Sequence, residues 1–511
     1  MSPAGTETTA RHRGLITVSI MLATIMQAVD TTIANVALPH MQGSMSATEE
    51  QISWVLTSYI VAAAIMTPMT GFLAARMGRK RLFIASVIGF TVTSILCGLA
   101  TSLSQIVLFR LLQGVFGAGL VPLSQAVLLD TYPRERHGSA MAMWGVGVMV
   151  GPILGPTLGG YLTEYYNWRW VFFINVPVGV LALSGILLFV RETERVARRF
   201  DLFGFALLSL AIGALQLMLD RGQSLDWFSS MEIVVEAFVA GLGLYMFIAH
   251  MLTADEPFLE PGLFKDRNLV IGLFFIFTIG IILLATLALL PPFLQNLMGF
   301  PVVTTGLVLA PRGIGSMAAM FLVGRLVNRV DVRLLIGTGL ILTATSLFEM
   351  AQFNLQISPW AVVHTGIIQG LGLGFVFVPL STITFSTLAQ RYRTEATAMF
   401  SLMRNIGSSI GISVMVTMAA RSTQLNHAVL GEQLNVFRAP VQSLLQGGGN
   451  GQSLALLNGE LTRQAAAIGY LNDFQVMAWM AVAALPLLLL FRRVPYHHDE
   501  EAEEEGVMVV D

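Results

Sequence analysis

The chain has 511 residues, of which 55% are hydrophobic and only 12% charged, and its formal net charge is −2. Soluble domains carry about 25% charged residues and keep a large wetted surface even at this length, so the composition excludes a soluble protein. A single cysteine, Cys97, excludes an intrachain disulfide and a cysteine-rich metal site. The apolar residues form long unbroken runs, which favour membrane-spanning helices over the short alternating segments of an outer-membrane barrel.

A helix needs about 20 mostly apolar residues to cross a bilayer. Such runs lie near 14–38, 51–75, 82–101, 103–128, 138–163, 168–190, 202–219, 231–252, 268–294, 303–327, 333–353, 360–385, 395–419 and 472–491. We therefore predict an all-α polytopic membrane protein with 14 transmembrane helices.

The distribution of lysine and arginine predicts the orientation. Most of the 29 basic residues fall in the connections on the same side as the N-terminus, and cytoplasmic loops carry this excess. Both termini are therefore expected in the cytoplasm. The expected divisions are a tail (1–13), a six-helix bundle (14–191), two inserted helices (192–267), a second bundle (268–491) with a long outer loop (420–471), and an acidic tail (492–511).

An internal repeat divides the chain. Gln113-Gly114 recurs as Gln369-Gly370 at an offset of 256, and Pro122-Leu-Ser recurs as Pro379-Leu-Ser at an offset of 257. Two parallel repeats of six spans follow, and the seventh and eighth spans are an insertion, which gives a 6+2+6 arrangement.

The loop after the second span is rich in glycine and basic residues. It contains Gly71, Arg76, Gly78 and Arg79, and it resembles the signature loop of the major facilitator superfamily, where basic residues gate the cytoplasmic face. Ala75 stands where that family has an acid, which argues against an acid-centred gating network. Anchoring by positive charge alone accounts for the basic residues after Gly78.

The fifth span carries glycines at every fourth position, which open a groove on one helix face. The residues of this motif are Gly147, Gly151, Pro152, Gly155, Pro156, Gly159 and Gly160. The run resembles the antiporter motif of the same superfamily, which marks exporters. The resemblance implies packing against the repeat mate, the thirteenth span, through Gly407 and Gly411.

Two charges lie deep in the first repeat. Asp30 in the first span and Arg110 in the fourth are at matching depths, about 12 Å and 10 Å from the outer helix ends. Charges inside hydrocarbon are costly and point to function. We predict that they pair and exchange a proton, although a purely structural ion pair is the alternative.

Several other side chains in the spans are candidates for binding a substrate, mostly through apolar contact. These are Met26, Asn35, Gln113, Trp144, Gln369, Arg404 and Asn405. Arg312 is a further arginine deep in a span. The spans thus contain one deep acid, Asp30, and three deep arginines, Arg110, Arg312 and Arg404. This balance predicts a cavity that suits neutral or weakly acidic amphiphiles better than dications.

From 14 to 491 the chain resembles the fourteen-span drug:proton antiporters of the major facilitator superfamily. The resemblance rests on the motifs above and on 26–37, 168–179 and 217–228. It implies efflux of hydrophobic drugs by alternating access, driven by the proton gradient without a cofactor or metal. It also implies a periplasmic adaptor protein, an outer-membrane channel and a place in a bacterial inner membrane, where the segment 420–471 is a candidate adaptor contact.

The sequence is also compatible with two other kinds of transporter. One is a proton-coupled exporter or importer of a specific metabolite or lipid-like compound, and another is a permease driven by a separate ATPase. Neither Lys80 nor Lys265 follows a glycine, so the chain has no P-loop of its own. The sequence around Ser409 matches a hydrolase elbow, but it lies inside a predicted membrane helix rather than a strand-to-helix turn. We therefore expect a transporter and not an enzyme.

Overall fold

The computed structural model describes residues 3–432 (apart from 194, 196–198 and 328), 434 and 450–492, and their regular elements are all helical. The first part contains α1 (Pro3–Met45), α2 (Glu49–Met66), α3 (Met69–Met77), α4 (Arg79–Leu99), α5 (Leu103–Gly117), α6 (Leu120–Thr131), α7 (His137–Tyr165), α8 (Trp170–Phe173) and α9 (Asn175–Phe189). Then follow α10 (Leu202–Arg221) and α11 (Met231–Thr253). The last part contains α12 (Arg267–Pro292), η4 (Phe293–Leu297), α13 (Val302–Leu326), α14 (Val332–Met350), α15 (Pro359–Ser386), α16 (Arg393–Glu432), α18 (Asn450–Ala484) and η6 (Leu485–Leu490).

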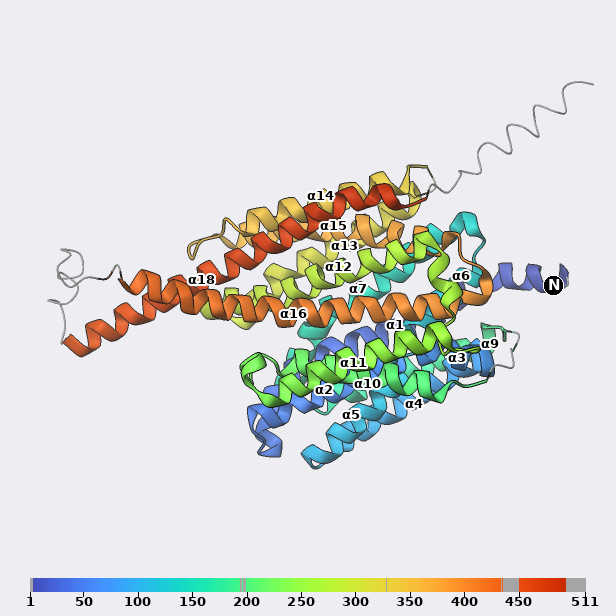
Figure 1. Ribbon diagram of the computed structural model, residues 1–511, viewed down its shortest axis with the longest axis horizontal. Coiled ribbons are helices and arrows are strands. Elements are labelled where there is room, and N and C mark those ends of the chain that lie inside the picture. Colours follow the sequence, from blue (N-terminus) through green and yellow to red (C-terminus); the bar gives the residue numbers. More distant parts are fainter. Residues whose placement is uncertain are drawn as a thin grey trace, which may run out of the picture.

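The long helices lie side by side with their axes roughly parallel (Figure 1). Among the described residues, 13 helices are long and apolar enough to cross a membrane, and the bent pair α2–α3 makes 14. This number agrees with the prediction. The pair bends by 57° at Thr67–Pro68, because Pro68 has no backbone N–H to continue the helical hydrogen bonds.

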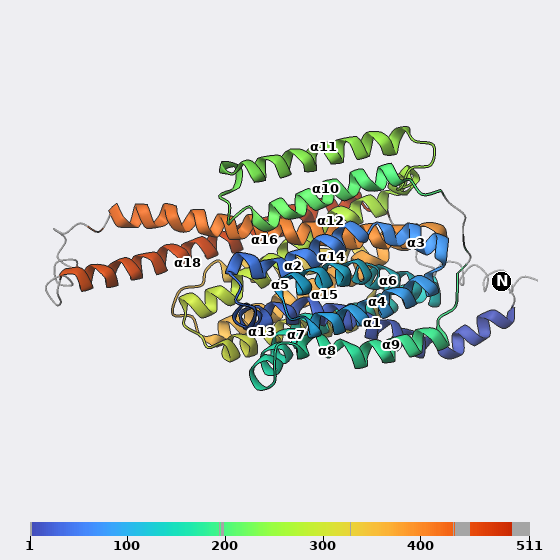
Figure 2. The same ribbon diagram turned by 90° about the horizontal axis from the view of Figure 1, so that it is seen from below.

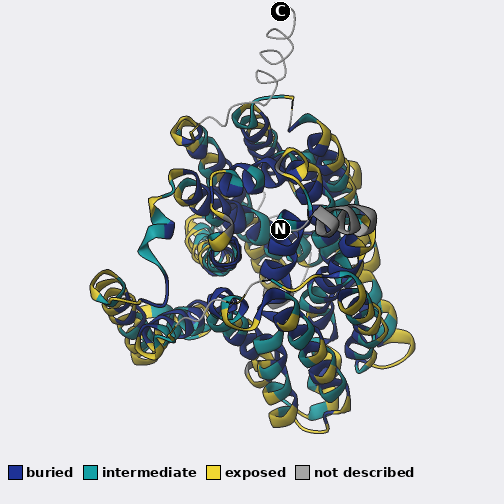
Figure 3. Cartoon of the chain, turned by 90° about the vertical axis from the view of Figure 1, so that its right-hand side faces the viewer, coloured by how far each residue is buried: buried dark blue, intermediate teal, exposed yellow. Residues whose placement is uncertain are grey.

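The two ends of the helical bundle differ in composition and in shape. The basic end is formed by the start of α1, the α3–α4 junction and residues 391–393, and it lies on the right of Figure 1. The far end, on the left, carries the tips of α16 and α18. The helices turn their buried faces inward and their exposed faces outward, as the view along the bundle shows (Figure 3).

The prediction of a loop over 420–471 is wrong for the described residues at its two ends, which are helical: α16 continues to Glu432 and α18 begins at Asn450. α16 has 40 residues and α18 has 35, so they are about 60 and 52 Å long, against a hydrocarbon core of about 30 Å. Their tips project beyond the other helices as a pair (Figures 1 and 2). Hydropathy detects only the part of a helix that lies in lipid, so it did not predict these polar extensions, although the residues from Leu454 to Tyr470 form an amphipathic stretch in the sequence. Residues 435–449, between the tips, and the acidic tail from 493 onward lie outside the described part.

α10 lies against both α2 and α16, and α11 lies outside it (Figure 2). Asp220 accepts a hydrogen bond from the Thr57 hydroxyl of α2, while the Leu219 carbonyl accepts one from Ser413 of α16 at 2.7 Å. α11 is largely exposed and turns only a few small or apolar residues inward, such as Gly243. An apolar helix with so exposed a surface is suited to lipid.

Candidate functional site

A buried ion pair joins α1 to α5. Arg110 Nη1 donates to Asp30 Oδ2 at 2.7 Å, and the two side chains are 1% and 0% exposed. The same Nη1 donates to Gln113 Oε1 at 2.7 Å, and Arg110 Nε donates to the Val55 carbonyl at 3.2 Å. The predicted pairing of Asp30 with Arg110 is therefore present, and Gln113 belongs to the same cluster.

Neighbouring helices complete the hydrogen bonds of Asp30. Its Oδ1 accepts from Gln113 Nε2 at 3.0 Å and from Asn175 Nδ2 of α9 at 2.7 Å. Ser94 of α4 accepts from both amides. The ring of Tyr59 on α2 lies 4.3 Å from the Arg110 guanidinium carbon, close enough for a cation–π contact. Five helices thus enclose the pair, and we call these residues the Asp30 cluster.

The chemistry of the Asp30 cluster follows from its burial. A carboxylate without water is stabilised only while a cation and N–H donors surround it. If Arg110 moves away, the uncompensated carboxylate is best neutralised by a proton. The geometry is therefore that of a site where a proton and an arginine can alternate on one carboxylate.

The second repeat contains an uncharged counterpart of this cluster. At the offset of 256, Asp30 corresponds to Thr286 and Gln113 to Gln369. Gln369 Nε2 donates to Thr286 Oγ1 at 3.3 Å, and this hydroxyl donates to Met477 Sδ of α18 at 3.8 Å. The charged pair is thus replaced by neutral groups in the second bundle.

The predicted substrate residues do not form one group. Gln113 and Gln369 are each bonded inside their own bundle, and Met26 is buried. Trp144 of α7 lies between the bundles, where it stacks on Phe377 of α15 with ring centroids 5.7 Å apart. Its indole nitrogen donates to Ser124 at 2.8 Å.

Asn35 is exposed, about one and a half turns from Asp30 towards the far end of α1. The structure does not bring it to the buried glutamines.

Two arginines of the second repeat lie against the same stretch of α12. Arg312 Nη2 is 3.4 Å from the Leu283 carbonyl, and the Arg404 backbone approaches Gly280, one turn away. Asn405 follows Arg404 and is half-buried. Neither arginine forms an ion pair with any residue in the described part of the chain.

The glycine motif of α7 packs differently from the prediction. A Cβ on Gly151 would lie 2.7 Å from Ala28 Cβ, and one on Gly155 would lie 2.7 Å from Thr32 Cβ, so both glycines face α1. The predicted partner, α16, turns Gly407 and Gly411 to α12 instead. Glycine lets each pair of helices approach closely within a bundle.

Of the other residues of the glycine motif, some contact α1 and others do not. Gly147 lies against Met21 and Gly159 against Ile33, both on α1. Pro152 is half-buried, and Gly160 has open space at its Cβ position. The side chain of Pro156 lies outside the described part.

Between the bundles, α7 packs on α13. Gly313 lies against Ile153, and Gly138 lies against Val327 nearer the basic end. The prediction that the glycine motif packs against the thirteenth span was thus wrong. A sequence alone does not show which face of α7 meets which helix.

An acid-centred cluster closes the basic end, contrary to the prediction from Ala75. Asp130 at the end of α6 pairs with Arg79, and its Oδ1 accepts from Arg393 Nη1 of the second bundle at 2.8 Å. Arg79 Nε also donates to Thr394 at 2.7 Å. The acid comes from a different helix than in the family signature, so the loop pattern could not reveal it.

Close packing accompanies this cluster. Gly71 leaves room for Glu395, whose Cα is 3.1 Å from the Gly71 Cβ position, and Gly78 has a φ of +90°. That left-handed conformation suits glycine. Arg76 is exposed nearby. We call Arg79, Asp130 and Arg393 the basic-end gate.

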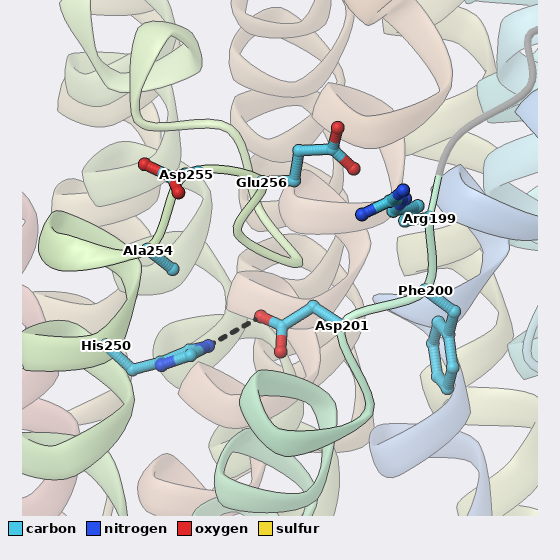
Figure 4. A pocket seen from close by; sticks show the side chains of 7 residues that line it. All are labelled: Arg199, Phe200, Asp201, His250, Ala254, Asp255 and Glu256. Carbon is cyan, nitrogen blue, oxygen red and sulfur yellow. Dashed lines mark hydrogen bonds and ion pairs between the residues drawn. The ribbon is translucent and has the colours of Figure 1, made fainter.

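A shallow hollow of about 390 Å³ lies beside α10 and α11 (Figure 4). Asp201 caps α10 by accepting from Gly204 N, and it also accepts from Phe258 N and pairs with His250 at 2.9 Å. Asp201 therefore has a structural role, because these bonds connect the start of α10 to the end of α11 and to the segment that follows it. Among the described residues, no group of three or more His, Cys, Asp or Glu side chains could hold a metal ion.

Sequence reasoning missed several residues of these clusters. Asn175 and Ser94 lie in apolar runs without any charge nearby in the sequence, and only the fold brings them to Asp30. Asp130 stands at the end of a span and reads as an ordinary boundary residue. Asp473, the second residue of the last predicted span, was not singled out, and it is fully buried in α18.

Comparison with known proteins places these features in a family. Residues 20–412 match the model of the Major Facilitator Superfamily. The chain is 38% identical to the "Multidrug export protein EmrB" of Escherichia coli K12 over 93% of its own length and 94% of that protein. It is 36% identical to the "Fatty acid resistance protein FarB" of Neisseria gonorrhoeae over 94% and 96%.

Solved structures share the fold at low identity. The proton:xylose symporter XylE matches with a TM-score of 0.63 and 13% identity, covering 94% of this chain and 96% of that one. The human organic anion transporter MFSD10 matches with a TM-score of 0.61 and 14% identity, covering 96% and 100%. A family model that matches most of the chain, together with relatives aligned over nearly its whole length, shows that this protein belongs to the major facilitator superfamily.

Proposed function

We propose that this chain is a multidrug exporter that moves hydrophobic or amphiphilic toxic compounds out of the cell in exchange for protons. The names of the relatives, a multidrug export protein and a fatty acid resistance protein, support export of apolar toxins. The observation that carries the proton coupling is the Asp30–Arg110 pair, fully buried at 2.7 Å. A carboxylate in a dry interior needs a counter-charge or a proton.

The proposed cycle is alternating access between the two bundles. The basic-end gate joins them where the inner opening would be, so the described conformation is closed on that side. When the gate opens, substrate enters and Asp30 releases its proton to the cytoplasm as Arg110 pairs with it. When the far side opens, Asp30 takes a proton from the periplasm, and substrate leaves.

The substrate class follows from the uncompensated charges. Arg312 and Arg404 lie one turn apart along α12 without a carboxylate partner among the described residues. Buried arginine favours an anionic group and repels a second cation. We propose that neutral and weakly acidic amphiphiles are preferred over dications, which agrees with the name of the fatty acid resistance relative.

We further propose the setting of a tripartite pump in a bacterial inner membrane, with both termini cytoplasmic and the helices arranged 6+2+6. The paired tips of α16 and α18 would then project into the periplasm. His427 bonds to Asn458 at 3.1 Å and Asn472 to Ser422 at 3.2 Å, which ties the tips together. Exposed apolar residues such as Leu456, 73% exposed, offer a contact for the adaptor protein that leads to the outer-membrane channel.

The second candidate is a proton-coupled transporter of one metabolite or lipid-like compound. It shares the coupling site and differs in substrate range and in direction. The glycine motif of α7 resembles that of exporters and favours export.

Purified protein in liposomes tests the proposal. An imposed pH gradient should drive transport of a neutral hydrophobic dye without ATP, and Asp30→Asn should abolish the driven transport. Glu460→Gln, which neutralises an exposed acid on α18, is the control. Driven transport that persists in Asp30→Asn would remove Asp30 from coupling, and transport of a single polar metabolite alone would favour the second candidate.

A further inference from the structure

Asp473 of α18 is a second buried acid, and it belongs neither to the Asp30 cluster nor to the basic-end gate. The residue is 0% exposed. Neither of its carboxyl oxygens has a hydrogen-bond partner among the residues that the structure describes. Most buried polar side-chain atoms in proteins have such a partner, so a carboxyl with none requires an explanation.

Aromatic and apolar groups surround Asp473. Tyr470 and Phe474, on either side of it in α18, contact the ring of Phe293 with centroids 5.7 and 6.4 Å away. One turn towards the basic end, Met477 accepts from Thr286 of α12. One turn towards the far end, Gly469 packs against α16: a Cβ atom on Gly469 would lie 2.8 Å from the Ala419 carbonyl oxygen. Residues four apart share a helix face, so Asp473 lies over the junction of α12 and α16.

No neighbouring element supplies a counter-charge. α12 has no charged residue beyond Arg267, and η4 has none. On α16, Arg421 is exposed, and on α14, Glu349 pairs with His364 at 3.3 Å. Among the described residues of α18, Tyr470 is the titratable group nearest to Asp473. Arg463 is exposed and lies about three turns away, where its Nη1 donates to the Leu297 carbonyl of η4 at 3.3 Å. An ionised Asp473 would therefore be an unpaired charge in an apolar site, which costs several kcal/mol, whereas the protonated acid carries no such penalty.

The element that covers Asp473 is irregular. Pro291 and Pro292 end α12, and Phe293–Leu297 continue as a π-helical turn. Prolines remove two backbone donors, and π-helical turns occur frequently at functional sites. The wall over Asp473 is thus the part of this bundle where a small rearrangement can admit water.

We propose that Asp473 is a second proton-binding site of the transporter. In the described conformation the carboxyl holds a proton. When η4 moves and water from the periplasmic side reaches the group, the O–H bond breaks, the proton passes to water, and the carboxylate is hydrated. The reverse step takes a proton from that side and restores the closed conformation. The inference rests on the proposed proton-driven export, to which it adds a carboxyl that links periplasmic pH to conformation.

Infrared difference spectroscopy on the full chain in lipid tests the protonation directly. The carbonyl stretch of a protonated carboxylic acid should be present in the wild type and lost in Asp473→Asn. Glu460→Gln, on the same helix but exposed, should not remove it. If the spectra of the wild type and Asp473→Asn have the same carboxylic acid band, the proposal is wrong. Thermal unfolding gives a second criterion, because Asp473→Leu should be at least as stable as the wild type, and a clear loss of stability would contradict a neutral acid.

Transport distinguishes this inference from the function on which it rests. In liposomes at fixed internal pH, Asp473→Asn should still exchange substrate across the membrane, but its flux should depend less on the pH of the periplasmic side. Asp30→Asn should lose driven flux altogether. If the wild type shows no pH-driven flux while the infrared band still depends on Asp473, the proposed function fails and the proton site stands. Sodium that stabilises the wild type but not Asp473→Asn would identify a cation site and overturn the proposal.

Discussion

Asp130 joins the end of α6 to Arg79 of α4 and to Arg393 of α16, so its charge should determine how firmly the basic end stays closed. It pairs with Arg79 and with Arg393, and the arginine side chains are 10% exposed and Asp130 is 17% exposed. Removing one partner of a buried pair costs about 3–5 kcal/mol. Because these groups keep some exposure, we take about 3 kcal/mol for Asp130→Asn, which corresponds to roughly a 150-fold shift in the conformational equilibrium.

The shift can be read from the reactivity of a cysteine behind the gate. Ser401 is 3% exposed and lies one turn deeper on α16 than Thr397, which bonds to the Pro122 carbonyl of the first bundle at 3.1 Å. In a Cys97→Ser background, Ser401→Cys should react slowly with a membrane-impermeant maleimide added from the side of the basic end. Asp130→Asn should accelerate this reaction by up to about 150-fold.

Two comparisons make that experiment decisive. Asp255→Asn neutralises an exposed acid near the same end and should leave the rate unchanged. An unchanged rate in Asp130→Asn, in protein that still unfolds cooperatively, would refute the reasoning that the acid-centred cluster holds the basic end closed.

Three further predictions concern packing, the ion pair and the substrate. Gly151→Val should destabilise the α1–α7 contact by about 1–3 kcal/mol, whereas Gly160→Val, at a position with open space, should not, and equal melting temperatures would contradict this packing. Arg110→Gln should destabilise the protein by about 3–5 kcal/mol by leaving a buried carboxylate unpaired, and the added change Asp30→Asn should recover part of the loss in thermal unfolding; failure to recover would show that the two residues act independently. Arg404→Gln should weaken the binding of a carboxylate-bearing amphiphile more than that of its neutral ester, as measured by tryptophan quenching, and an equal effect on both would remove Arg404 from recognition of the anionic group.

The sequence allowed the number of membrane helices and the Asp30–Arg110 pairing to be predicted, because both follow from strong local signals. Runs of about 20 apolar residues mark spans, and an acid and an arginine at equal depths in hydrocarbon have few partners other than each other. The repeat offset of 256 also identified equivalent positions, although it could not show that Thr286 replaces the acid as a working hydrogen-bond partner.

Other features depend on which helix faces meet, and a single sequence does not determine this. Gly151 was expected to face the thirteenth span and faces α1, because small residues permit close packing without naming a partner. Asp473 was not predicted because it stands at the start of the last apolar run, where an acid is typical of a helix end outside the membrane. The extension of α16 to Glu432 was missed because polar helices outside the membrane have no hydropathy signal.

Proton release on substrate binding is the measurement closest to the central claim. Purified wild-type protein in weakly buffered solution should release protons when a neutral hydrophobic substrate is added, because substrate binding draws the molecules whose Asp30 is protonated into the ionised state, in which Asp30 pairs with Arg110 as the structure shows. Asp30→Asn should bind the substrate and release none through this site. Equal proton release from both proteins at equal substrate binding would contradict the account, because coupling would then lie elsewhere than in the Asp30 cluster.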